Sequence, residues 1–220
     1  VGFVFSNFLA KTGNFVANGT GGSGGEDNTG VGILASNIMA ANGIVDIDGK
    51  GGSGKVVLEN NGVGIWSAQS SILNTMSDYT DSSSNLLQLF DSYSYTDTSG
   101  NSTTWYGNKI EAASIDIQGV GGKPTDKNQS LKNFGISMDD TKLTSSGTMN
   151  LTGQGGDGGQ SIAGINIKDV TVKAGGDTVF TGIAGVGDRV TKGEGIIFDS
   201  STLEVTSANQ VKLIGTGSGV

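Results

Sequence analysis

The chain has 220 residues, a net charge of -8 and a single arginine, Arg189, which excludes the clustered Lys and Arg that binding to a nucleic-acid backbone requires. Cysteine and histidine are absent, which excludes disulfides, thiolate or imidazole metal sites and the Ser/His and Cys/His catalytic pairs. No apolar run approaches the roughly 18 residues that span a bilayer, and the 39 glycines follow no three-residue collagen period.

A glycine-rich run that follows alternating apolar positions recurs along the chain, first as FVANGTGGSGG from Phe15. The later copies are IVDIDGKGGSG from Ile44, SIDIQGVGGKP from Ser114, TMNLTGQGGDGG from Thr148, TVFTGIAGVGD from Thr178 and QVKLIGTGSGV from Gln210. The anchor glycine that closes the strand in each copy is Gly19, Gly49, Gly119, Gly153, Gly182 or Gly215. Subtracting their numbers gives spacings of 30, 70, 34, 29 and 33, and we interpret the 70 as two periods. A period near 30 predicts a solenoid.

Each repeat is expected to contain three short strands. The first follows a Gly-apolar signal, as at 32–35 and 164–167, and the second follows a turn, as at 37–40 and 170–173. The third ends on the anchor glycine. Strands of this length, bounded by Gly, Asn, Asp or Ser, predict an all-β fold. The whole chain, 1–220, is therefore predicted to be a single parallel β-helix (β-solenoid) segment of about seven coils, taken from a longer repeat array.

The positions before the anchor glycine predict which side chains face the core. The residue two positions before the anchor is apolar in all six copies: Ala17, Ile47, Ile117, Leu151, Phe180 and Leu213. We expect this column to point inward and stack, with the mostly polar next residue facing outward. The anchor glycine is expected to adopt a positive φ at a corner. The loops that follow it should decorate a single edge of the rod, because they occur at the same phase in every coil.

Residues 76–108 interrupt the pattern and predict an irregular coil with long aromatic loops, in which residues 86–90 are candidates for the missing third strand. The ligand-contact candidates are Trp66, Tyr79, Tyr93, Tyr95, Trp105 and Tyr106. Aromatic rings beside Asp, Asn and Ser suit a glycan or a protein partner, since rings cover apolar sugar faces and polar groups bond hydroxyls. The alternative is that these rings pack the long loops onto the rod.

Three acidic residues are candidates for catalytic or metal-binding groups. Asp46 and Asp48 share an outward face, and Asp116 lies in the column of Asp46. Because the 70-residue spacing counts as two periods, Asp46 and Asp116 should lie two coils, about 9 to 10 Å, apart. With no third aligned acid, we expect no catalytic site and no enzyme. GGDGG from Gly155 and GGSGGED from Gly21 match a calcium repeat only loosely, so calcium is a weak alternative to having no cofactor or metal.

The repeats VDIDGKGGSG, SIDIQGVGG and MNLTGQGGDGG, followed in turn by Gly-Val-Gly-Ile, Gly-Ile-Ser-Met and Gly-Ile-Asn-Ile, resemble the shafts of filamentous-haemagglutinin-like adhesins of Gram-negative bacteria. The resemblance covers nearly the whole chain except 76–108. It implies a right-handed β-helix, secreted or attached to the bacterial surface, that serves as a stiff extracellular rod for adhesion or cell contact. The partners it implies are neighbouring coils of the same long chain, a host or partner-cell glycan or surface protein, and further copies in self-assembly. The alternative is a carbohydrate-active β-helix, such as a tailspike-like glycosidase or a polysaccharide lyase.

Overall fold

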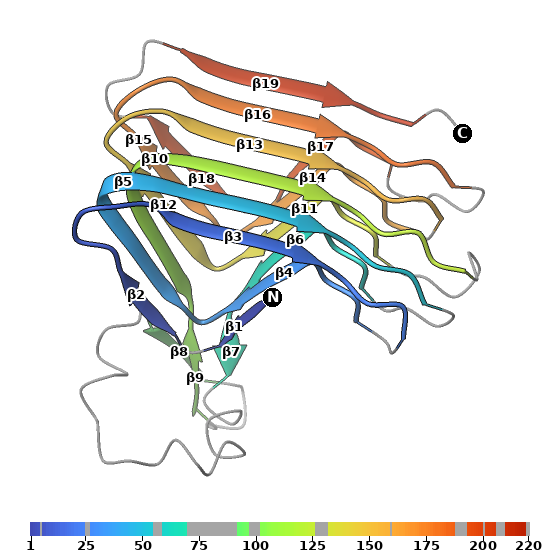
Figure 1. Ribbon diagram of the computed structural model, residues 1–220, viewed down its shortest axis with the longest axis horizontal. Coiled ribbons are helices and arrows are strands. Elements are labelled where there is room, and N and C mark those ends of the chain that lie inside the picture. The colour runs from blue at the N-terminus through green and yellow to red at the C-terminus, as the bar shows by residue number, and fades with distance from the viewer. Residues whose placement is uncertain are drawn as a thin grey trace.

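The computed structural model describes residues 1–4, 6–24, 27–54, 59–69, 92–96, 102–125, 132–158, 160–187, 193–199, 201–205 and 210–218. In these residues, parallel strands stack into two large sheets (Figure 1). The six-stranded sheet contains β1 (Gly2–Val4), β4 (Val31–Leu34), β6 (Val63–Trp66), β11 (Ile136–Asp139), β14 (Ile165–Lys168) and β17 (Ile196–Asp199). The ten-stranded sheet contains β2 (Asn7–Leu9), β3 (Phe15–Thr20), β5 (Asn37–Lys50), β10 (Asn108–Val120), β12 (Thr141–Ser145), β13 (Met149–Gln154), β15 (Thr171–Ala174), β16 (Thr178–Ile183), β18 (Thr202–Val205) and β19 (Val211–Thr216). The prediction of an all-β parallel β-solenoid is confirmed.

The ten-stranded sheet supplies two faces of the solenoid, because β5 and β10 continue around a corner. The first half of β10 pairs with β12, and its second half pairs with β13. In the coil of β12 and β13, residues 146–148 turn this corner and separate the two strands. Each coil thus has three strands and three corners, as the repeat predicted. The coils stack from the blue first coil to the red last coil in Figure 1.

The register of the third face fixes the number of coils. The anchor glycines pair directly in the order Gly19, Gly49, Gly119, Gly153, Gly182 and Gly215. Five steps separate the first from the last, so the described chain forms about five turns of about 32 residues rather than seven coils. The interpretation of the 70-residue spacing as two periods is wrong, because β5 pairs directly with β10. The right-handed sense of the coil stays a prediction.

The predicted inward column forms a continuous core stack. Ala17, Ile47, Ile117, Leu151 and Phe180 are at most 4% exposed and lie in register. Leu213 lies in the same column but is 52% exposed, because no described strand pairs with the outer side of β19. Full burial stabilises the fold by about 1.5 to 3 kcal/mol for each large apolar side chain.

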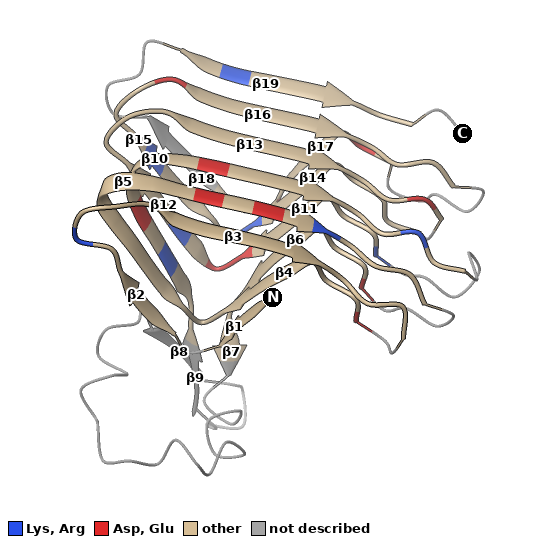
Figure 2. Ribbon diagram, in the orientation of Figure 1, with Lys and Arg blue, Asp and Glu red and all other residues tan. Residues whose placement is uncertain are grey.

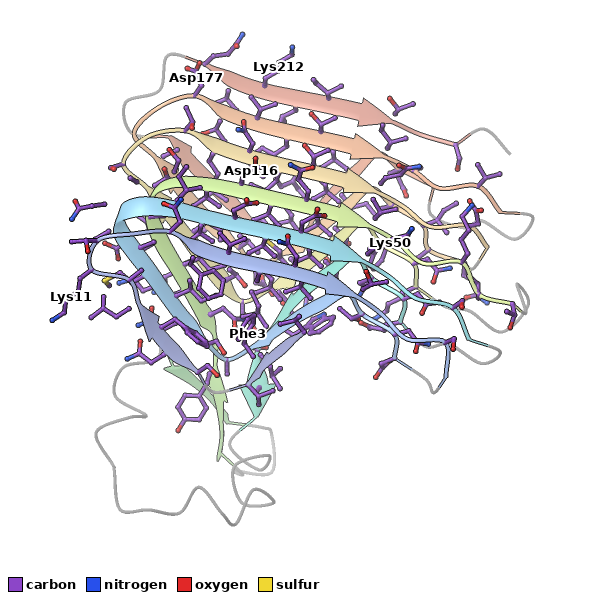
Figure 3. All side chains as sticks on the ribbon, in the orientation of Figure 1. Phe3, Lys11, Lys50, Asp116, Asp177 and Lys212 are labelled. Atoms are coloured by element: carbon purple, nitrogen blue, oxygen red, sulfur yellow. The ribbon has the colours of Figure 1, made fainter. Side chains whose placement is uncertain are left out.

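Three phenylalanine side chains fill the first coil, one from each face. Phe3, Phe8 and Phe15 lie with ring centroids 5.0 to 5.5 Å apart, and Figure 3 shows Phe3 at this end of the molecule. Their register partners in the next coil are Ile33, Ile38 and Val45. The aromatic rings therefore continue the core that the smaller side chains form in the following coils.

The anchor glycines are needed for close backbone contact, and the prediction that they adopt a positive φ is wrong. Among the described glycines, only Gly158 has a positive φ, of 73°. The anchor glycines lie inside strands, and a Cβ at Gly119 would overlap the carbonyl of Gly135, on the limb that returns from the loop. The same overlap occurs between Gly49 and Gly62. The coil therefore narrows at the anchors from Gly19 to Gly182 into two backbone limbs in direct contact.

The described parts of the loops that follow the anchor glycines lie along a single edge of the solenoid, as predicted (Figure 1). Hydrogen bonds continue the stack beyond the strands. The amide of Gly21 donates to the carbonyl of Lys50, and that of Gly51 donates to Val120, each at 2.8 Å. The loop edge is therefore bonded from coil to coil in the same way as the sheets.

An inserted segment leaves the solenoid at one corner between β6 and β10. It contains a small antiparallel sheet of β7 (Ala68–Gln69), β9 (Ser102–Tyr106) and β8 (Ser92–Thr96). In the neighbouring coil, Thr141 turns the same corner by donating its hydroxyl to the carbonyl of Asp139 at 2.9 Å. Asn108 occupies the equivalent position and donates its side-chain amide to the carbonyl of Trp66, also at 2.9 Å. The predicted strand at 86–90 lies outside the described residues.

Gly119→Ala should lower the free energy of unfolding by about 1 to 3 kcal/mol, because the new methyl group cannot fit between the two limbs. Gly215→Ala is the matched control in the same column, since a Cβ there would meet its nearest atom at 3.7 Å, and Gly32→Ala, at 3.6 Å, is a control in an inner coil. Both controls should stay within about 0.5 kcal/mol of the wild type. Chemical denaturation measures all three. Equal losses at the three positions would contradict the close-contact explanation.

Candidate ligand-binding groove

The structure distributes the predicted aromatic contacts over different elements. Trp66 is the last residue of β6, on the outer face of the six-stranded sheet. Tyr106 packs with Leu34 against Ala35 and Ala68 at the neighbouring corner. This contact corresponds to the alternative to ligand binding, in which the aromatic rings serve packing.

The other aromatic candidates belong to the inserted segment. Tyr93 of β8 lies directly opposite Trp105 of β9, and Tyr95 lies opposite Thr103. Tyr79 lies outside the described residues. The backbone register therefore brings Tyr93 and Trp105 together, whereas Trp66 lies on a strand of the solenoid itself.

A groove runs beside Trp66 along the six-stranded sheet. Its floor is a column of mostly small residues in register, namely Gly32, Gly64, Ser137 and Asn166. One wall is formed by Leu34, Trp66, Asp139 and Lys168, and the other by Asp27, Glu59, Lys132 and Ser161, which pair through single β-bridges. Two hollows of about 360 and 320 Å³ lie in this groove and share Trp66 and Glu59.

The indole ring of Trp66 lies against the backbone of Gly64. A Cβ at Gly64 would overlap three atoms of the ring, and a Cβ at Gly32 would meet the ring at 3.6 Å. The ring therefore extends along the floor toward the preceding coil. Gly64 is buried beneath it, while the half-buried Trp66 lines both hollows.

The carboxylate of Glu59 is held in a fixed orientation beside Trp66. One oxygen accepts a hydrogen bond from Lys132 Nζ at 2.9 Å, and the other accepts from Asn61 Nδ2 at 3.0 Å. Asn61 is fully buried, and its own oxygen accepts from the amide of Phe134 at 3.2 Å. The Glu59 side chain is 24% exposed, so it can meet a ligand without moving.

Asp139 lines the opposite wall next to a second lysine. Lys168 Nζ lies 3.8 Å from Asp139 Oδ1, and this buried oxygen accepts no hydrogen bond. Burial, followed by the neighbouring charge of Asp140, raises the pKa of Asp139. Asp139 is therefore a half-buried carboxylate on this wall of the groove.

The carboxylates of Asp139, Asp140 and Asp169 form the group that could share a cation in the described part of the chain, with ligand atoms within 4.8 Å of one another. Lys168 also lies 3.7 Å from Asp169, so a cation of the protein already lies among these acids. In the GGDGG loop from Gly155, which loosely matches a calcium-binding repeat, Asp157 pairs with Lys123 at 2.7 Å.

Asp46, Asp48 and Asp116 form a second polar surface, on the ten-stranded sheet. The predicted two-coil separation is wrong, since Asp46 and Asp116 are direct register partners on adjacent strands, about 4.8 Å apart at the backbone (Figure 2). Figure 3 shows Asp116 midway along this face. Burial and the charges of Asp46 and Asp48 raise the pKa of Asp116, while a hydrogen bond from Gln118 acts in the opposite direction.

The sequence analysis missed the residues that surround Trp66. Glu59, Lys132 with Ser137, and Asn166 come from three successive coils, so no single repeat shows them together. The Gly-apolar signal could have found two of them, because aligning GVGI, GISM and GINI places Gly64, Ser137 and Asn166 at one outward position.

Comparison with models of protein families found no matching family, and comparisons with curated proteins and with solved structures found no match either. In the described part of the chain, no helical segment has the length and hydrophobicity that crossing a bilayer requires. The fold and the groove define the chain as a β-solenoid that carries a mixed aromatic and polar groove on one face.

Asp116→Asn should raise the melting temperature at pH 7 and lose this advantage as the pH falls. A raised pKa means that the folded protein holds the proton more tightly than the unfolded chain, so the charged carboxylate costs stability at neutral pH. That cost disappears as the pH falls through the raised pKa toward the ordinary value of 3.8. Thermal denaturation across this range measures the difference, and Asp48→Asn, exposed on the same face, should change it less. A wild type more stable than Asp116→Asn at pH 7 would contradict the expected repulsion.

Proposed function

We propose that this chain is a rod segment of a secreted or surface-attached bacterial adhesin or extracellular fibre, and that it mediates adhesion or cell contact without enzymatic activity. The observation that carries the proposal is the unbroken register of the anchor glycines from Gly19 to Gly215. The style of the repeats, which resembles filamentous-haemagglutinin-like shafts, supports the extracellular location.

The solenoid gains length without a larger core. Each coil adds about 4.8 Å along the axis and hydrogen-bonds to its neighbours through all three faces and the loop edge. The inward side chains stack on those of the next coil, while the outward side chains are free to vary. Such a rod holds binding groups away from the cell surface and displays them to a glycan, a surface protein or another copy of the chain.

A second candidate function is a carbohydrate-active β-helix, and the adjacency of Asp46 and Asp116 favours it. Retaining glycosidases hold two carboxyl groups about 5 to 5.5 Å apart, which is close to one strand spacing. A raised pKa, as at Asp116, is also a property of a general acid. However, the two hollows beside Trp66 lie on the other sheet. The rod is therefore the better supported function.

Electron microscopy of the protein in its native assembly tests the rod. We expect thin, unbranched rods one coil wide, whose length grows by about 4.8 Å for every repeat in the parent chain. Protease treatment of intact producing cells should release the rods, because they lie outside the membrane.

A compact trimer or a globular particle would overturn the rod. The carbohydrate-active candidate would then be tested by substituting Asp46, Asp48 and Asp116 and measuring the release of reducing sugar from polysaccharides.

A further inference from the structure

We propose that the groove beside Trp66 binds a neutral, linear oligosaccharide, which lies along the axis of the solenoid with one sugar ring on the indole. This inference goes beyond the proposed rod function, because a rod needs no ligand on this face. The ligand contacts residues of the solenoid rather than of the inserted segment.

The placement of the indole supplies the aromatic platform. Its benzene edge lies against the backbone of Gly64, and Trp66 lines both hollows. An indole that lines a groove can cover the apolar C–H face of a sugar. The glycine floor makes this geometry possible, since any side chain at residue 64 would lift the ring.

The polar groups around the indole suit hydroxyl groups. Glu59 is fixed by Lys132 and Asn61, and the half-buried Asp139 lies on the opposite wall. Ser137 and Asn166 continue the floor and offer both donors and acceptors. A few fixed polar groups around an apolar surface are typical of a site that orients a small ligand.

The shape of the groove favours a linear chain of sugars. The floor column from Gly32 to Asn166 crosses four adjacent strands, or three strand spacings of about 4.8 Å, so it extends about 14 Å along the axis. The floor residues are in register, so the groove is straight. It begins with glycines under the indole and continues with polar residues, which suits a ligand stacked at one end and hydrogen-bonded along the rest.

The charges of the lining favour a neutral ligand over a polyanion. The carboxylates of Asp27, Glu59 and Asp139 face the two hollows, and the two lysines of the lining already pair with two of these acids. The chain as a whole carries a net charge of -8, which opposes the approach of a polyanion.

Titration of the full chain with cellohexaose, maltohexaose and the hexasaccharide of chitin tests the inference. Tryptophan fluorescence reports binding directly when Trp105→Phe leaves Trp66 as the single indole. We expect at least one neutral oligosaccharide to bind and to change this fluorescence. In the wild-type background, calorimetry should show that Trp66→Ala weakens the same binding about tenfold or more.

Two further variants test the position of the indole and provide a control. Gly64→Ala retains the indole but displaces it from the floor, so it should also weaken binding, whereas Asn150→Ala, exposed on the ten-stranded sheet, should leave the affinity unchanged. Circular dichroism verifies that each variant is folded. The inference is overturned if no neutral oligosaccharide binds, if binding survives both Trp66→Ala and Gly64→Ala, or if oligogalacturonate binds more tightly than every neutral probe. None of these outcomes would bear on the rod seen by electron microscopy.

Discussion

Contact between two backbone limbs at the anchor glycines is the constraint on which the rest of the structure depends. At Gly49, Gly119 and Gly153, the space that a Cβ would fill contains the carbonyl of the limb that returns from the loop. This contact closes each coil at one corner and sends the chain out into a loop at the same phase in every turn. Because the phase never drifts, β-strands of successive coils align, and inward side chains stack into one narrow core.

The groove also depends on positions that lack a side chain. Gly32 and Gly64 leave room for the indole of Trp66 against the backbone of the six-stranded sheet, and Ser137 and Asn166 extend that floor. The walls come from strand ends and from the limbs that return from the loop edge. A regular stack thus produces a binding surface simply by varying its outward residues, which fits a rod that both spans a distance and contacts a partner.

The parts of the fold that repeat locally could be predicted from the sequence. Strand alternation around Ile47, Ile117 and Leu151 marks the core face in each copy, so the inward column follows from periodicity alone. The 70-residue spacing was wrongly interpreted as two periods, because the insertion at a corner lengthens the spacing but leaves the pairing of β5 with β10 intact. The groove escaped prediction because it combines residues from four coils. The positive φ expected at the anchors was wrong because the missing side chain, and not the backbone freedom of glycine, is what those positions require.

The continuity of the solenoid depends on direct pairing of β5 with β10 across the insertion. Because the sequence has no cysteine, introduced cysteine pairs can measure this pairing. Asp48→Cys combined with Gln118→Cys places two exposed thiols on register partners of adjacent strands. Asp48→Cys combined with Thr152→Cys places them two strands apart, at about 9.6 Å. Mild oxidation should cross-link the first pair rapidly and leave the second pair reduced, because a disulfide requires Cα atoms within about 7 Å. A first pair that stays reduced, like the second, would contradict the direct pairing and restore a further coil between the two strands.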